Sequence, residues 1–114
     1  MNQEIVDSIT KKFEELYGDT TGAKIYFAPG RVNLIGEHVD YLGGHVFPCA
    51  LTIGTYMIVK PRTDSAIRFF SINIKPERKY EDKLENIFSH ENPAKHYVKT
   101  LGWTAYPKGV IWAF

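Results

Sequence analysis

The chain has 114 residues, of which 44% are hydrophobic and 24% charged, and these values are ordinary for a small globular domain. A net charge of +1 gives no electrostatic reason to expect nucleic acid or an acidic membrane as a partner. A single cysteine excludes an internal disulfide, and the N-terminal stretch lacks the apolar region of a secretory signal. Because no run is long and apolar enough to span a bilayer, we expect a soluble cytoplasmic protein.

The first predicted element is an amphipathic helix over residues 3–17, followed by Gly18 as its C-terminal cap. Its apolar residues recur at spacings of three and four, which places them on one face of a helix. They are Ile5, Ile9, Phe13 and Leu16. We expect this face to pack on the rest of the domain.

Strands are predicted next. Residues 25–27 are strand formers, Pro29-Gly30 is expected to interrupt the strand, and residues 32–35 to resume it. A turn is predicted at Gly43-Gly44. The following stretch, "VFPCALTIGTYMIVKPR", favours one or two strands with a bend at Gly54.

The second half of the chain is less regular. Residues 66–74 predict a further strand, and the charged residues 75–92 predict a loop or a sheet edge. Residues 93–101 predict a short helix opened by proline. The last stretch, "YPKGVIWAF", begins a helix and ends without a cap or a polar tail, so we expect the chain to be a fragment of a longer protein.

One stretch, "PGRVNLIGEHVDY" at residues 29–41, carries most of the candidate chemistry. Arg31 supplies a planar cation for phosphate or carboxylate, and Glu37 and Asp40 can accept hydrogen bonds from hydroxyl groups. His38 can donate or accept near neutral pH. In an extended chain His38 and Asp40 point to one face and Glu37 to the other, so a turn is needed to bring them together.

Three interpretations of this stretch remain open from the residues alone. Two carboxylates and an imidazole suit a polyol, a divalent metal, or simply a solvated cluster of salt bridges. The sequence contains no P-loop, no H-E-x-x-H pair, no zinc-spaced partner for Cys49 and no G-x-S-x-G. Composition and spacing therefore indicate a polar site on a strand–turn segment.

The run from Gly30 to His38, followed by Asp40 and Tyr41, closely resembles the galactokinase signature, a form of the N-terminal motif of the GHMP small-molecule kinases. The likeness continues through "GGHVFPCAL" and, more loosely, through "YPKGVIWA". It implies an α/β (α+β) fold with a mixed sheet and helices. It also implies that residues 1–114 are the N-terminal galactose-recognition part of such a domain, truncated before the glycine- and serine-rich ATP-binding loop.

The resemblance assigns a role to each residue of the motif. Glu37, His38 and Asp40 would bind galactose hydroxyls, with Asp40 reaching the 3- and 4-hydroxyls. Arg31 would be the catalytic residue beside the reacting anomeric hydroxyl. The remaining motif residues would let backbone approach the sugar or support the loop, and they are Gly30, Gly36, Asn33 and Tyr41.

The same resemblance implies that the parent protein phosphorylates galactose with ATP and Mg²⁺, both bound mainly by residues absent from this chain, and that the chain alone is inactive. Its uncovered apolar residues would favour self-association, or complementation by the missing remainder. Alternatives are a galactokinase-like sugar sensor, an N-acetylgalactosamine kinase, and a metal-dependent hydrolase. Val39, Leu42 and Ala105 depart from the family pattern and leave loop geometry and sugar preference open.

Overall fold

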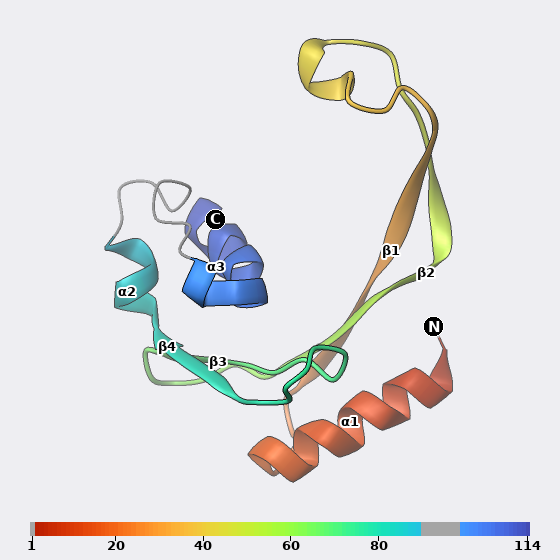
Figure 1. Cartoon of the computed structure of the whole chain (residues 1–114). Coiled ribbons are helices and arrows are strands. Elements are labelled where there is room, and N and C mark those ends of the chain that lie inside the picture. Colours follow the sequence, from red (N-terminus) through yellow and green to blue (C-terminus); the bar gives the residue numbers. More distant parts are fainter. Residues whose placement is uncertain (1, 90–98) are drawn as a thin grey trace. The chain divides into compact units, whose positions relative to one another are not determined.

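The computed structural model describes residues 2–89 and 99–114, which form two compact units (Figure 1). Unit 1, Met1–Pro61, holds helix α1 (Gln3–Tyr17), strand β1 (Lys24–Ile35), the short 3-10 helix η1 (Asp40–Leu42) and strand β2 (Phe47–Val59). Unit 2, Arg62–Phe114, holds β3 (Ala66–Phe69), β4 (Tyr80–Lys83), α2 (Leu84–Phe88), the 3-10 helix η3 (Lys99–Thr104) and α3 (Ala105–Ala113). The predicted class of helices combined with sheet is confirmed, and both sheets are antiparallel strand pairs.

Helix α1 begins and ends where the sequence predicts. The side chain of Asn2 caps it by accepting from the amides of Glu4 (3.0 Å) and Ile5 (3.4 Å). At the other end the Gly18 amide donates to the Glu14 carbonyl at 2.9 Å. The predicted apolar face is half-buried except at Ile5, which is 40% exposed.

Strands β1 and β2 form a long antiparallel hairpin that begins at Lys24 opposite Val59. The prediction that Pro29-Gly30 interrupts the strand is wrong, because β1 continues through both residues with a shift of register before Arg31. Proline lacks an amide donor, so a strand with a free edge can contain it. Gly54 lies opposite Pro29, and a side chain there would clash with the carbonyl oxygen of Ala28.

At the end of the hairpin next to α1, one face is half-buried and the other is exposed. Phe27 and Tyr56 are register partners with ring centroids 4.7 Å apart, and the Tyr56 hydroxyl accepts from the amide of Asn2 at 2.8 Å. This face of β2 therefore contacts α1. On the opposite face Tyr26 and Met57 are 50% and 53% exposed. Nearer the far end, the chain's single cysteine lies exposed on β2 opposite Val32.

An ion pair closes the end of the hairpin near α1. Lys60, directly after β2, contacts Asp19 through its Nζ atom, at 3.0 Å from the carboxylate and 2.7 Å from the backbone carbonyl. The same carboxylate accepts from the hydroxyl and the amide of Thr21 at 2.6 and 2.9 Å. These bonds, those from Thr21 most of all, lower the pKa of Asp19 from 3.8 to about 2.

Unit 2 is organised around a strand pair and an aromatic cluster. Strands β3 and β4 pair from Ala66 opposite Lys83 to Phe69 opposite Tyr80. The ring of Trp103 meets those of Phe69 and Tyr80 edge-on, at centroid distances of 6.3 and 5.8 Å. This packing joins η3 to both strands.

A half-buried ion pair attaches α3 to β4. Lys108 Nζ lies 2.7 Å from Asp82 Oδ2, and Asn86 donates to the other carboxylate oxygen, also at 2.7 Å. Burial raises the pKa of the Asp82 carboxyl, but the hydrogen bonds from Lys108, Asn86 and the Lys83 amide outweigh burial, and its pKa is lowered.

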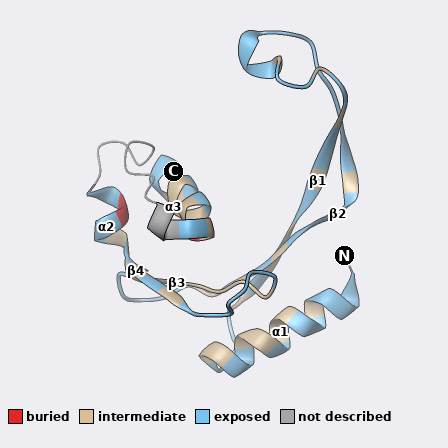
Figure 2. Ribbon diagram, viewed as in Figure 1, coloured by how far each residue is buried: buried red, intermediate tan, exposed pale blue. Residues whose placement is uncertain are grey.

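Little of the chain is fully buried (Figure 2). Among the described residues only Ile87 and Thr104 are buried, at 6% and 1% exposure. Within the same residues, no helix is long and apolar enough to cross a membrane.

Two predictions for unit 2 need correction. The strand predicted over residues 66–74 ends at Phe69, and the loop predicted over residues 75–92 contains β4 and α2. The helix predicted at residues 93–101 lies mostly outside the described residues, and residues 99–101 belong to η3. The final predicted helix is confirmed as α3.

Asp19 should make the stability of the fold depend on pH. Its folded pKa of about 2 lies below the usual 3.8, so the ionised carboxylate stabilises the fold above the higher value, and this contribution is lost as pH falls through the interval. We expect Asp19→Asn to be less stable than the parent chain near neutral pH and to lose less stability on acidification. Denaturation followed by circular dichroism on both sides of the interval measures this.

Lys60→Met provides the matched control. It removes one donor to Asp19 but keeps both from Thr21, so it should weaken the pH dependence of stability without abolishing it. Equal acid sensitivity in the parent chain and Asp19→Asn would contradict the assignment.

Candidate functional site

The motif residues lie at the far end of the β1–β2 hairpin, on and beside the connection formed by residues 36–46, which we call the hairpin tip (Figure 1). Ile35 and Phe47 are the last register pair before it. Inside the tip, the Val39 carbonyl accepts from the amides of Leu42 at 3.1 Å and Gly44 at 2.8 Å. Backbone hydrogen bonds thus close this turn with Leu42 at the position that departs from the pattern of the resemblance.

Gly36 makes the turn out of β1 possible. Its φ of 95° is in the region that disfavours side chains, and a Cβ there would lie 2.6 Å from the His45 carbonyl and 2.8 Å from Val46 Cα. A turn at residues 37–39 therefore follows Gly36 directly. Gly30 likewise permits a close approach of the two strands, since a Cβ there would lie 3.2 Å from the Ile53 carbonyl oxygen.

Four polar side chains, one from β1 and three from the tip, lie in series. Asn33 Nδ2 donates to Glu37 Oε2 at 3.0 Å, and Glu37 Oε1 lies 3.9 Å from His38 Nε2. His38 Nδ1 in turn lies 3.2 Å from the Tyr41 hydroxyl. The structure thus brings together Glu37 and His38, which an extended chain would hold on opposite faces.

His38 achieves this through an unusual backbone. Its φ is 61°, and within the described part of the chain it is the only residue besides glycine with a positive φ. A left-handed conformation at such a residue costs about 1–2 kcal/mol. Such backbone strain is typical of binding and active sites.

Asp40 and Arg31 have different surroundings. Asp40 opens η1, and its carbonyl accepts from the Gly43 amide at 3.2 Å. Arg31 lies on β1 opposite Ala50. Both are exposed, and neither side chain forms an ion pair or hydrogen bond with another described residue. The structure does not join them to the series of four, and their charged groups are open to a ligand.

No group of three or more His, Cys, Asp or Glu side chains in residues 2–89 and 99–114 is arranged to hold a metal ion. The sequence also lacks the glycine- and serine-rich phosphate loop.

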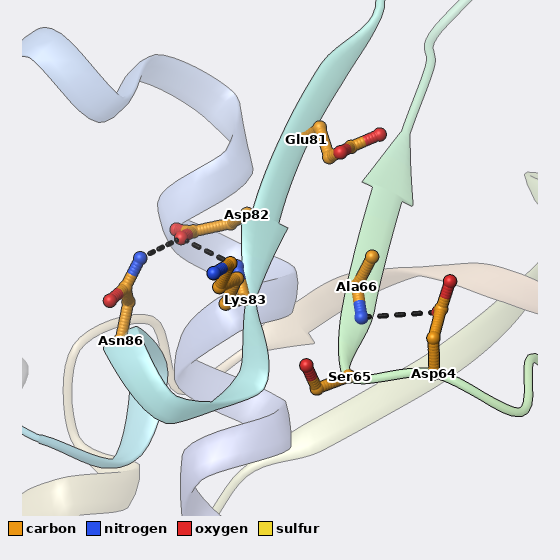
Figure 3. A pocket seen from close by; sticks show the side chains of 7 residues that line it. All are labelled: Asp64, Ser65, Ala66, Glu81, Asp82, Lys83 and Asn86. Atoms are coloured by element: carbon orange, nitrogen blue, oxygen red, sulfur yellow. Dashed lines mark hydrogen bonds between the residues drawn. The ribbon is translucent and has the colours of Figure 1, made fainter.

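A shallow depression in unit 2 contains acidic residues that sequence reasoning had not singled out (Figure 3). Each of its three carboxylates pairs with a cation, Asp64 with Arg62, Glu81 with Arg68 and Asp82 with Lys108. These partners explain the cluster as part of the fold.

Gly36→Ala should destabilise unit 1 more than Gly43→Ala. Both glycines have a positive φ, but a Cβ at Gly43 meets nothing within 4 Å. Strain alone should cost Gly43→Ala about 1 kcal/mol, whereas the added backbone clash should raise the cost for Gly36→Ala to about 2–4 kcal/mol. Chemical denaturation of the two variants tests the difference, and equal losses would contradict the crowding at Gly36.

Comparisons with known proteins agree with the motif. A family model described as the galactokinase galactose-binding signature matches residues 11–61. The galactokinase of Bacillus subtilis is 48% identical over 102 residues, which is 90% of this chain and 24% of that protein. The galactokinase of Clostridium beijerinckii is 44% identical over 111 residues, 97% of this chain and 26% of that protein.

The fold agrees as well. A crystal structure of Lactococcus lactis galactokinase complexed with galactose matches with a TM-score of 0.76 and 36% identity, covering 92% of this chain and 25% of that one. The chain thus spans about a quarter of the length of the curated relatives it matches. Over that quarter the chain is similar to galactokinases in sequence and in fold, and its residues 11–61 match the galactose-binding signature of that family.

Proposed function

We propose that this chain is the galactose-recognition part of a galactokinase, which transfers a phosphoryl group from Mg-ATP to the anomeric hydroxyl of galactose and yields galactose 1-phosphate. The observation that carries the proposal is the match of the galactose-binding signature to residues 11–61, which include the hairpin tip. The galactose in the Lactococcus lactis relative supports the choice of sugar.

In this proposal the exposed polar groups of the tip bind the sugar. Glu37 and Asp40 accept hydrogen bonds from its hydroxyls, and a carboxylate can accept from two adjacent hydroxyls at once. His38, held beside Glu37, contributes a ring nitrogen. Asp40 is open to solvent at the start of η1 and reaches the 3- and 4-hydroxyls of galactose.

Arg31 acts on the reacting end of the sugar. Its guanidinium is always charged, and a cation beside the anomeric oxygen stabilises the negative charge that develops there during transfer. The nucleotide and metal supply the phosphoryl group when bound, and their ligands lie mainly outside this chain.

Asp40→Ala and Arg31→Lys should separate binding from catalysis in the full-length kinase. Loss of the Asp40 carboxylate removes charged hydrogen bonds to the sugar worth about 1.5–3 kcal/mol, so KM for galactose should rise by roughly ten- to a hundredfold.

Arg31→Lys keeps the charge but loses the planar fork, so it should mainly lower kcat.

Steady-state kinetics with galactose and ATP varied separately measure both effects. An Asp40→Ala enzyme with KM for galactose and kcat within about twofold of the parent would exclude the Asp40 role. An Arg31→Lys enzyme with normal kcat and weaker galactose binding would make Arg31 a binding residue only.

We further propose that the 114 residues alone are inactive and self-associate unless the rest of the kinase covers them. The apolar side chains of α3 support this, because Tyr106 is 73% exposed and Val110 57% exposed. Tyr26, Ile53 and Met57 on the hairpin are at least half exposed as well. Burial of one such side chain is worth about 1.5–3 kcal/mol, so several together favour a partner.

Sedimentation equilibrium at micromolar concentration and a coupled ADP assay test this proposal on the isolated chain. We expect oligomers and no galactose-dependent ADP release. Adding the complementary part of a galactokinase as a second fragment should reduce self-association. A monomer with cooperative unfolding, or ADP release above a host-enzyme control, would contradict the proposal.

A further inference from the structure

The carboxylate of Glu37 is anchored by one residue of the neighbouring strand. Glu37 lies on the hairpin tip and its side chain is 72% exposed. Asn33 is half-buried in β1, opposite Pro48, where the register shifts a second time before Ile35. The Asn33 side-chain amide donates to Glu37 Oε2 at 3.0 Å. The donor is thus held by a strand, whereas the acceptor belongs to a long side chain with many rotamers.

The chemistry of the two groups sets the direction of this bond. A carboxylate only accepts, so the Asn33 amide must present its nitrogen, because its oxygen would face another acceptor. A hydrogen bond to an ionised acceptor is stronger than one between neutral groups. An exposed glutamate otherwise samples many rotamers, and ordering it on binding costs free energy.

The bond leaves the second carboxylate oxygen available. Glu37 Oε1 lies 3.9 Å from His38 Nε2, beyond the range of a direct hydrogen bond. Among the described residues, Glu37 is also the only side chain to which Asn33 is hydrogen-bonded. The contact therefore orders Glu37 without occupying the oxygen that faces His38.

We propose that Asn33 is a positioning residue that orients the Glu37 carboxylate for the sugar before the sugar binds. The inference rests on the proposed galactose site. It assigns to Asn33 a contribution to sugar affinity that acts through Glu37 and involves no contact with the sugar.

A donor–acceptor exchange tests this in the full-length kinase. Asn33→Asp places a second carboxylate against Glu37, and repulsion plus the lost bond should weaken galactose binding about three- to tenfold. The value of kcat and the affinity for ATP should stay within about twofold, because Asn33 acts on sugar binding and not on the phosphoryl transfer that follows it. In the Glu37→Gln background the new carboxylate can accept from the glutamine amide, so Asn33→Asp should cost less than about twofold.

Asn86→Ala is the matched control. Asn86 also donates to a carboxylate four residues away, Asp82 at 2.7 Å, but it does so in unit 2. This variant should lower thermal stability and leave galactose affinity unchanged. Calorimetric titration with galactose, together with thermal unfolding of each variant, gives all the required quantities.

The outcomes separate the two proposals. If the unmodified kinase binds no galactose, the proposed function fails, and the sugar role of Asn33 fails with it. If galactose binds but Asn33→Asp weakens it by the same factor in both backgrounds, only the positioning role is overturned. A loss of ATP affinity equal to the loss of galactose affinity would likewise show a general structural effect and overturn it.

Discussion

The antiparallel pairing of β1 and β2 determines where every residue of the motif at residues 29–41 can lie. Arg31 and Asn33 belong to β1 itself, and the tip follows directly after the last register pair. Two register shifts in β1 change which face each residue occupies, so the positions of these side chains cannot be obtained from simple alternation. Glycines at positions 36 and 54 permit the close backbone contacts on which this course depends.

Two kinds of carboxylate stand out among the described residues. Those of Asp19 and Asp82 each accept several hydrogen bonds and join segments far apart in the sequence, through Lys60 and Lys108. Such carboxylates stabilise the fold, and their oxygens are already occupied by hydrogen bonds within it. The carboxylates of the tip are exposed and at most partly engaged, as a site for an external ligand requires. The contrast supports the proposed division between structural and sugar-binding acids.

The features that the sequence predicted are those encoded within a few neighbouring residues. Helix α1 follows from its apolar spacing and its cap at Gly18, and the candidate site follows from one continuous motif. Prediction failed where a local rule had an exception. Pro29 fits in β1 because, among the described residues, this strand pairs along one edge only. Strand β4 was missed because its sequence, "YEDK", is charged. In that strand Tyr80 and Asp82 are nevertheless half-buried, and the Asp82 carboxylate forms an ion pair with Lys108 of α3, a helix distant in the sequence.

The contacts within the site were also beyond prediction. The pairing of Glu37 with His38 depends on a left-handed backbone at His38, and no residue type other than glycine reliably indicates that conformation. The link from Asn33 to Glu37 depends on the turn at Gly36. The motif therefore identified the participants, while the geometry of the hairpin was needed to show which of them hold one another.

The position of Cys49 makes the hairpin accessible to spectroscopy. It is the only thiol of the chain, it is exposed, and its register partner Val32 lies between Arg31 and Asn33. Partner residues in an antiparallel pair have Cα atoms only about 4.5–5.5 Å apart. A small fluorophore or spin label attached at Cys49 would therefore report on the strand beside the proposed catalytic cation, and could follow sugar binding without any phosphoryl transfer.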